Sequence, residues 1–544
     1  MSNPTLPATQ YALQLVGPGQ LKLNPAKPVV PPGPHQVLAR IECVSLCFSD
    51  LKLLKQFDQH PRKGAVARGI SPQVLSEIPS YVPGTQPTVP GHEVTLRIVA
   101  VGPNVKHHKV GERCIAQTDY RDLPTAGSAS AFGYNFEGAL QEYVLMDERV
   151  IIDPAGERFL IPVSDQPAAA AVALVEPWAC VEDSYVNVER QALKAGGRLL
   201  VVADDPARVS LDSLPCEPAG KPAEVLRQTP GQVGALADQS FDDILYFGAS
   251  KAVLEVLNDK LAARGIINIV LGGKRIGAPV NVGVGRIHYG MTRWIGTTGS
   301  NPAEPYNTIP RTCELRNGDS FVVVGAGGPM GQMHVIRALC SGVPNLTVIG
   351  TDMDDARLAS LQKKAEPFAK ANGVALQMVN TVKTPLPGKY SYFALMAPVP
   401  ALVSNSIRDS QPGCLINLFA GIPAPTKHEL DLDTYIANRC FMLGTSGSTI
   451  DDMKIVLKKV TADRLNTNCS VDAVSGMAGA TAGITAVENR TLAGKIVVYP
   501  MLHDMGLIPL VDLHQHYPTV AAKLVNGQWT KAAEDELLRV AAKA

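Results

Sequence analysis

The sequence predicts an α/β protein in which a β-rich N-terminal part precedes two tandem units built on doubly wound parallel sheets. Short β-branched runs broken by Pro and Gly fill residues 10 to about 165, and they show no helical periodicity. Apolar strands alternate with helical segments after residue 195, as in a parallel sheet. Two stretches of this second part also resemble each other. The chain has 544 residues, so we expect roughly two to four domains.

Composition describes a globular protein, with 46% hydrophobic and 18% charged residues. The 50 basic and 50 acidic side chains cancel, so we expect neither nucleic acid nor a membrane as a partner. The apolar run 168–180 contains a glutamate and is shorter than the roughly 20 residues of a membrane helix. The N-terminus lacks a secretory pattern, and the ten cysteines form no CxxC pair. Both features predict a cytoplasmic protein with reduced thiols.

An internal repeat organises the second part of the chain. Residues 243–273 align with residues 392–422, so that strand, helix, glycine turn and second strand coincide. The copies then end in similar pentapeptides, GTTGS at 296–300 and GTSGS at 444–448. Copy one has no glycines after its opening strand and is shorter between its first strands. We therefore expect copy one to be a degenerate half that has lost its nucleotide site.

Copy two carries a candidate dinucleotide site. In FVVVGAGGPMGQMHVIRAL (321–339) an apolar strand leads through four glycines into a helical segment, and such a loop lets backbone and helix N–H groups approach a pyrophosphate. The next strand ends in an acid 21 residues after the last glycine. An acid at this place binds a ribose hydroxyl and repels a 2′-phosphate, so we expect NAD to be preferred over NADP. An ordinary turn with a surface Asp is the alternative. The candidate cofactor-binding residues are Gly325, Gly327, Gly328, Met330, Gly331, Asp352 and Arg357, the last either on the adenine or solvated.

Three segments combine metal-binding side chains: CVSLCFSDLKLL (43–54), PGHE (90–93) and LVEPWACVEDSY (174–185). In this order they resemble the zinc-dependent medium-chain dehydrogenase/reductase family, over about residues 10–190 and 311–500. The resemblance implies a GroES-like catalytic domain and a Rossmann-type cofactor domain. It also implies that Cys47, His92 and Glu176 bind one catalytic zinc, with Glu93 either a ligand or in exchange with water.

The same resemblance implies roles for residues near the first ligand. Ser49 would pass the substrate's hydroxyl proton toward solvent, and Asp50 would brace the site. Lys52 stands where relatives often have a His, so it either ends the proton relay or holds an anionic substrate group. The stretch 112–143 has one cysteine where many relatives have four, which predicts a single zinc per chain.

A loop at 55–84 lengthens the spacing from Cys47 to His92 to 45 residues. Its basic residues either bind a phosphate or carboxylate of the substrate or form a solvated face. These residues are Arg62, Lys63 and Arg68.

The expected domains are a GroES-like domain at 1–165 completed by 495–544, a degenerate Rossmann-like copy at 166–310, and an NAD-binding Rossmann domain at 311–494. Relatives commonly dimerise through an edge strand of the cofactor sheet. We expect copy one to cover that edge as an intrachain pseudo-dimer with one continuous sheet. A homo-oligomer is also an open alternative.

These features predict a zinc-dependent alcohol or polyol dehydrogenase that moves hydride between NAD(H) and a secondary alcohol or ketone. The substrate would be a polyol, sugar or sugar phosphate, as in sorbitol and threonine dehydrogenases and sorbose-1-phosphate reductases, which the motifs resemble. One alternative is a zinc-free quinone or enone reductase of the same fold. Another is a non-catalytic NAD-sensing or assembly protein. Cys47, His92 and Glu176 together argue against the zinc-free reductase, and the intact set of Cys47, Ser49 and His92 argues against the non-catalytic protein.

Overall fold

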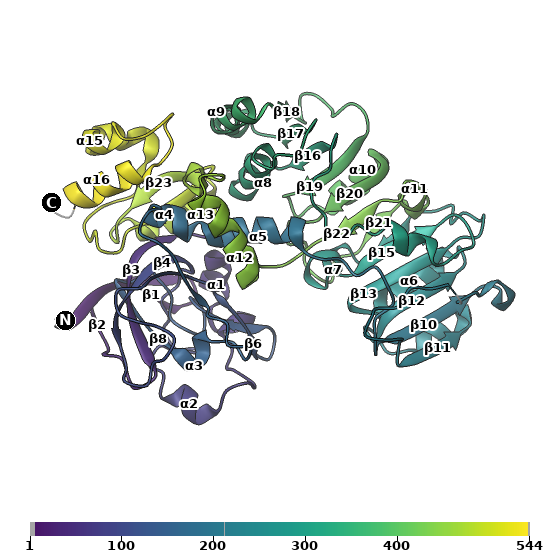
Figure 1. Cartoon of the computed structure of the whole chain (residues 1–544), viewed down its shortest axis with the longest axis horizontal. Helices are drawn as coiled ribbons and strands as arrows, with labels where there is room; N and C mark the ends of the chain where they lie inside the picture. The colour runs from purple at the N-terminus through teal and green to yellow at the C-terminus, as the bar shows by residue number, and fades with distance from the viewer. Residues whose placement is uncertain (1–5, 212, 542–544) are drawn as a thin grey trace. The chain divides into compact units, whose positions relative to one another are not determined.

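The computed structural model describes residues 6–211 and 213–541. The chain divides into two compact units, Met1–Cys180 with Gly447–Ala544, and Val181–Ser446. Helix α5 (Val175–Val186) carries the chain from the first unit into the second (Figure 1).

The first unit is built on a largely antiparallel sheet of eight strands. The path order is β25-β23-β24-β3-β4-β5-β9, and β8 pairs with β3 beside this path. The strands are β3 (Gln36–Ser45), β4 (Glu93–Val101), β5 (Arg113–Ala116), β8 (Tyr143–Asp147), β9 (Leu160–Pro162), β23 (Val471–Ser475), β24 (Lys495–Val498) and β25 (Ile508–Pro509). The unit also contains the hairpin β1 (Thr9–Gly17) and β2 (Gln20–Pro28), helix α4 (Ala169–Ala173) and helices α12 (Ile450–Thr461), α13 (Ala480–Asn489) and α16 (Lys531–Ala541).

The register of β3, β4 and β24 brings these three strands together at one edge of the sheet. Strand β3 runs antiparallel to β4 with Ser45 opposite Glu93. Strand β24 runs antiparallel to β3 with Val497 opposite Ser45. The end of β3 therefore meets the start of β4 and the second half of β24, although β24 is more than 400 residues away in the sequence.

Residues 447–494 belong to this first unit, whereas the sequence analysis placed them in the cofactor domain. The reason is that β23 pairs in parallel with β24 and thereby extends the same sheet.

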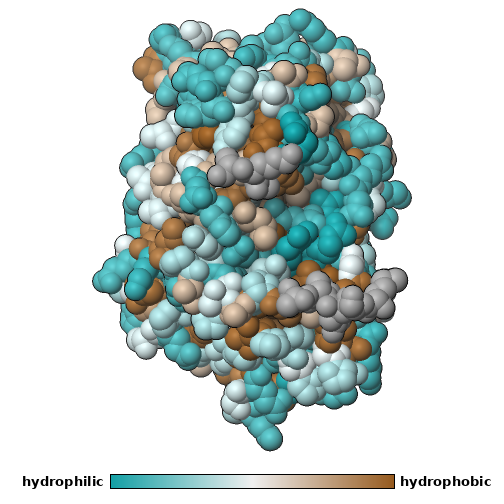
Figure 2. Space-filling model, turned by 90° about the vertical axis from the view of Figure 1, so that its left-hand side faces the viewer, coloured by the Kyte–Doolittle hydropathy of each residue, from teal (hydrophilic) through white to brown (hydrophobic). Residues whose placement is uncertain are grey.

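On the face drawn in Figure 2, hydrophobic side chains occur in small patches between hydrophilic ones. Among the helices of the described segments, none combines the length and apolar character needed to cross a bilayer.

Copy two, in the second unit, is a six-stranded parallel sheet in the order β18-β17-β16-β19-β20-β22. By sequence rank this is 3-2-1-4-5-6, the doubly wound order of Rossmann folds. The strands are β16 (Ser320–Val324), β17 (Thr347–Asp352), β18 (Ala375–Asn380), β19 (Tyr390–Leu395), β20 (Ser410–Asn417) and β22 (Phe441–Leu443). Helices α8 (Pro329–Leu339) and α9 (Asp355–Asn372) lie beside the first three strands, and α10 (Ala401–Arg408) connects β19 to β20 (Figure 1).

Copy one is a five-stranded parallel sheet in the order β11-β10-β12-β13-β15, one strand shorter than copy two. Its strands are β10 (Arg198–Ala203), β11 (Glu224–Gln228), β12 (Phe241–Phe247), β13 (Leu261–Val270) and β15 (Arg293–Thr297), with helices α6 (Lys251–Lys260) and α7 (Val284–Tyr289). In the described part of the connection from β10 to β11, the helical element is a single 3-10 turn, η3 (Pro206–Arg208). The sequence therefore correctly indicated a degenerate copy.

The two copies contact each other through equivalent elements. Strand β14 (Val280–Val282) pairs antiparallel with β21 (His428–Leu430). The two strands are equivalent in the repeat, because β14 follows β13 in copy one and β21 follows β20 in copy two. The edge strands β15 and β22 lie side by side but belong to two separate sheets, so the expected continuous sheet is not formed. The Tyr435 hydroxyl donates to the Trp294 carbonyl at 2.7 Å and accepts from the Met442 amide at 3.0 Å. The Tyr435 hydroxyl therefore binds a carbonyl of β15 and an amide of β22 that direct pairing of these two strands would otherwise use.

Candidate metal centre and cofactor loop

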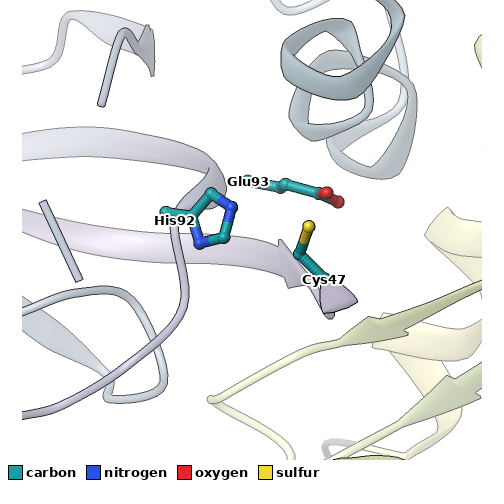
Figure 3. A group of neighbouring side chains, drawn as sticks. All are labelled: Cys47, His92 and Glu93. Carbon is teal, nitrogen blue, oxygen red and sulfur yellow. The ribbon is translucent and has the colours of Figure 1, made fainter. Parts of the chain in front are cut away.

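Cys47, His92 and Glu93 bring three ligand atoms within 4.8 Å of one another, and they are the one such group of three or more found among the described residues. Cys47 caps helix α1 (Phe48–Gln56) just after β3, and Glu93 opens β4 directly after His92. In Figure 3 the sulfur and the carboxylate point into the same space beside the imidazole. The strand register described above thus assembles thiolate, imidazole and carboxylate at one sheet edge.

Asp50 orients two of these side chains. Its Oδ1 lies 3.0 Å from Nδ1 of His92, and its Oδ2 accepts from the Cys47 amide at 3.0 Å. The carboxylate favours a proton on Nδ1, which leaves Nε2 as the ligand atom. The Ser49 hydroxyl lies 3.2 Å from that Nε2.

A buried lysine holds one oxygen of Glu93. Nζ of Lys495 lies 2.5 Å from Oε1 of Glu93 and donates to the Leu46 carbonyl at 3.2 Å. Burial lowers the pKa of Lys495, but the charges of Glu93 and Cys47 outweigh this effect and raise it. The other oxygen, Oε2, is buried and has no hydrogen-bond partner within the described chain. An orphaned carboxylate oxygen beside a thiol and an imidazole suits a metal ligand.

Glu176 lies in the first turn of α5, outside the compact group of three. Its pKa is raised to about 7, chiefly by burial and also by the charges of Glu93 and Asp119, although the charges of His92 and Lys495 oppose the shift. Several buried carboxylates around one thiol and one imidazole create a site that a divalent cation would stabilise.

The glycine loop of copy two has the tight geometry that a dinucleotide site needs. Gly325 has φ +83°, which favours glycine. A Cβ on Gly331 would lie 2.4 Å from the Gly325 carbonyl, and one on Gly327 would lie 2.6 Å from Cβ of Arg357 and 2.8 Å from Oδ2 of Asp352. The Gly327 amide also donates to that Oδ2 at 2.9 Å. The loop, Asp352 and Arg357 therefore lie together.

Two further loop residues begin helix α8. Gly328 is its N-cap, and Met330 is its second residue and is half-buried. Their backbone positions at a helix start suit an anion.

In copy one, side chains of the protein itself lie at the strand ends that correspond to those around the glycine loop of copy two. The Tyr246 hydroxyl donates to Oδ1 of Asp204 at 2.7 Å. Arg208 donates to the Leu271 carbonyl at 3.2 Å and fills the space above Gly272. These contacts fit a copy that has lost its nucleotide loop.

Comparisons with known proteins agree with this arrangement. The alcohol dehydrogenase GroES-like domain matches residues 33–155. L-sorbose 1-phosphate reductase of Klebsiella pneumoniae is 24% identical over 338 residues, 54% of this chain and 76% of that protein. Mannitol-1-phosphate 5-dehydrogenase of Aliivibrio fischeri is 22% identical over 344 residues, 54% of this chain and 75% of that protein.

Among solved structures, 2R,3R-butanediol dehydrogenase from Bacillus subtilis shares the fold. The TM-score is 0.53 at 14% identity, with 90% of this chain and 100% of that chain covered. A GroES-like domain is thus joined to a Rossmann-type sheet. The chain is therefore similar to alcohol and polyol dehydrogenases, by its GroES-like domain at residues 33–155 and by its fold.

The donor set of this site fits a catalytic zinc ion. Sulfur, nitrogen and oxygen ligands from Cys47, His92 and Glu93 are the types that zinc accepts, and three protein ligands leave a fourth position open. The glycine loop fits a nicotinamide dinucleotide, because side chains larger than glycine would collide there.

One residue of the inserted loop was misjudged from the sequence. Lys63 is fully buried, and its Nζ donates to the carbonyls of Val82 and Gln86, so it does not reach toward a substrate. Arg68 is exposed, as is Lys52 on α1. Burial of Lys63 is possible because backbone carbonyls replace water around its ammonium group.

Sequence reasoning missed three residues of the site: Lys495, Asp119 and Tyr134. Lys495 had a weak signal, a lone charge at the head of the apolar strand KIVV. Asp119 pairs with Arg62, and the Tyr134 ring lies 6.0 Å from the His92 ring, centroid to centroid. Neither of these two residues lies in a recognisable motif.

Proposed function

We propose that this protein is a zinc-dependent oxidoreductase of the medium-chain dehydrogenase/reductase type that transfers hydride between a nicotinamide cofactor and a secondary alcohol or ketone of a polyol, sugar or sugar phosphate. The observation that carries the proposal is the set of three ligand atoms within 4.8 Å at one sheet edge. The two relatives named above are a reductase and a dehydrogenase of sugar phosphates, which supports this substrate class.

In this proposal Cys47, His92 and Glu93 hold one zinc ion per chain. Glu176 is the exchange partner of Glu93, since it is buried nearby and coupled electrostatically to His92 and Glu93. Lys495 stabilises Glu93 when that carboxylate is not a ligand. Asp50 fixes the imidazole for metal binding.

A zinc ion held by these residues would supply Lewis acidity that lowers the pKa of a substrate alcohol, and a nicotinamide bound to copy two would supply the hydride chemistry. Ser49 is the first proton acceptor, because its hydroxyl lies 3.2 Å from Nε2 of the metal-binding imidazole. Lys52, exposed on the same helix as Ser49, connects this relay to solvent or faces an anionic substrate group. The largely buried position of His92 and Glu93 limits water at the centre.

We propose that copy two binds NAD(H) in preference to NADP(H). Gly325, Gly327, Gly328, Met330 and Gly331 form the pyrophosphate loop, and Asp352 receives the ribose hydroxyls. Support comes from the position of Asp352, which accepts from the loop itself. Arg357 beside Gly327 contacts the adenine side of the cofactor.

Copy one, in this proposal, takes the place of a second subunit. Its β14 pairs with the equivalent strand β21 of copy two, which is the self-complementary pairing typical of a two-fold dimer. An intrachain contact is independent of protein concentration, unlike a subunit contact. Hydrogen exchange of the β22 amides should therefore not change on dilution. Faster exchange in dilute samples would contradict the proposal.

We also propose that the protein works in the cytoplasm. All ten cysteines are free in the structure, which suits a reducing compartment. Cell fractionation with detection of the protein tests this placement.

Metal analysis combined with a cofactor assay tests the function. About one zinc per chain is expected, together with turnover of a polyol or sugar phosphate followed by NADH absorbance. Cys47→Ser should remove zinc and turnover while NADH binding persists, since the ligand lies in the first unit and the glycine loop in the second. A zinc-free protein that reduces quinones or enones, or one without any turnover, would reject the proposal.

A further inference from the structure

We propose that Lys52, His60 and Arg62 form an oxyanion-binding group beside the metal centre, and that its ligand is the phosphomonoester of a sugar or polyol phosphate. This inference rests on the proposed function and specifies its substrate class. The three residues form no part of the metal ligand set.

The inserted loop holds the backbone of Arg62 rigidly. The Thr125 hydroxyl donates to the Pro61 carbonyl at 2.8 Å, and the Asn135 amide donates to the Gly64 carbonyl at 3.0 Å. Between them, the buried ammonium group of Lys63 is held by two carbonyls. A loop fixed on both sides of one exposed position preorganises that side chain for binding.

The Arg62 side chain lies over Tyr134, whose ring is close to His92 of the metal centre. It is 31% exposed, and Nη1 donates to Oδ1 of Asp119. Its guanidinium carbon lies 5.4 Å from the centroid of the Tyr134 ring, whose distance to the His92 ring is 6.0 Å. Glu176 also acts on Arg62 electrostatically. Among the described residues, no side-chain or backbone acceptor is assigned to Nε or Nη2, so two donors remain for an oxyanion.

His60 adds a neutral donor on the same side of Tyr134. Its Nδ1 accepts from the Arg62 amide at 3.2 Å, which leaves the proton on Nε2. The His60 and Tyr134 ring centroids are 5.1 Å apart. Burial, and then the charges of Arg62 and Lys52, lower the pKa of His60 to about 4. The imidazole is therefore neutral at pH 7, and Lys52 is close enough for its charge to act on it.

The charge balance of this group favours an anion with several oxygens. Lys52 and Arg62 carry two positive charges, and Asp119 neutralises one of them. A guanidinium fork, an imidazole N–H and an ammonium group together match a phosphomonoester, which offers three acceptor oxygens. Tyr134 contacts both this group and the metal centre, so a substrate held here by its phosphate would extend toward the metal ligands.

A matched pair of ligands tests the inference: mannitol 1-phosphate and mannitol, with the zinc-loaded full chain. Wild type should bind the phosphate ester more tightly in calorimetric titration. Arg62→Met should weaken that binding by about 10- to 100-fold, as expected for loss of charged hydrogen bonds, and change mannitol binding less than about twofold. Arg68→Met is the matched control, because Arg68 is an exposed basic residue of the same loop, and it should bind both ligands like wild type.

A second variant separates recognition from structure. Asp119→Asn leaves the Arg62 guanidinium in place and removes a negative charge, so the phosphate ester should bind at least as tightly as to wild type. Equal losses of affinity for the phosphate ester in Arg62→Met and Asp119→Asn would show a structural ion pair and overturn the inference. Equal losses of affinity for mannitol 1-phosphate and mannitol in Arg62→Met would also overturn it. So would a wild-type protein that binds the two ligands equally well. Absence of turnover with either cofactor would reject the proposed function, while the titration would still decide the phosphate site.

Discussion

Oδ1 of Asp50 lies 3.0 Å from Nδ1 of His92, while the other oxygen of the same carboxylate accepts the Cys47 amide. One buried side chain therefore orients two proposed ligands that are 45 residues apart in the sequence. This double role makes the carboxylate a sensitive place to test the metal centre.

Asp50→Asn should lower zinc affinity by roughly 10- to 100-fold, because the amide no longer fixes the imidazole through a charged acceptor. Competition with a chromophoric chelator measures the change. Asp58→Asn is the control, since Asp58 accepts only from its neighbour Gln59 among the hydrogen bonds of the structure's described part. Unchanged zinc affinity in Asp50→Asn would contradict the assignment of His92.

Lys495→Met should destabilise the zinc-free protein by about 3–5 kcal/mol, since it leaves the buried Glu93 carboxylate without its partner. Zinc should restore much of the loss by pairing with that carboxylate. Urea unfolding with and without zinc measures both states, and the double variant with Glu93→Gln should recover stability without metal. An identical loss in both states would mean that Glu93 does not reach the metal.

Asp352→Ala should weaken NADH binding by at least about tenfold, as expected when a charged acceptor of ribose hydroxyls is lost. NADPH binding should change little or improve, because the carboxylate that repels its 2′-phosphate is gone. Fluorescence titration of both cofactors measures the ratio. Equal weakening would show that Asp352 only supports the loop through Gly327.

His334 predicts a pH dependence of stability. Burial and the charge of Arg337 lower its pKa to about 3, whereas the unfolded chain has a value near 6.5. Below pH 6.5 the unfolded state binds the extra proton, so stability falls as the pH drops toward 3. This residue contributes about 2 kcal/mol of that loss between pH 7 and pH 5.

His334→Gln should remove this part of the pH dependence, while the glutamine can still accept from the Tyr185 hydroxyl that now lies 2.6 Å from Nδ1. Urea unfolding at pH 7 and pH 5 provides the comparison. A variant with the same loss as wild type would mean that His334 does not remain neutral.

Tyr435→Phe should destabilise the chain by about 2–3 kcal/mol, because the Trp294 carbonyl and the Met442 amide both lose a buried partner. Tyr390→Phe is the control, since that hydroxyl donates to the Pro387 carbonyl only three residues before it in copy two. We expect the two variants to separate clearly in thermal unfolding. Similar small effects would indicate that the contact between the copies does not depend on the bridging hydroxyl.

The sequence predicted the features that depend on local pattern. The glycine loop, the α/β repeat and the degenerate state of copy one follow from spacing and strand–helix alternation. Lys495 and Asp119 escaped prediction because their positions depend on strand pairing and on an inserted loop, which no periodicity encodes. Lys63 was misjudged for a related reason: a basic residue in a polar loop gives no sign that two backbone carbonyls enclose its ammonium group.

The pairing of β14 with β21 also bears on how such a chain can change over time. In an assembly of identical subunits, every substitution at a two-fold contact appears on both sides at once. Here the two sides are separate stretches of one polypeptide, so either can vary while its counterpart stays the same. Copy one could therefore lose the glycine loop and one strand while it kept the surface that contacts copy two.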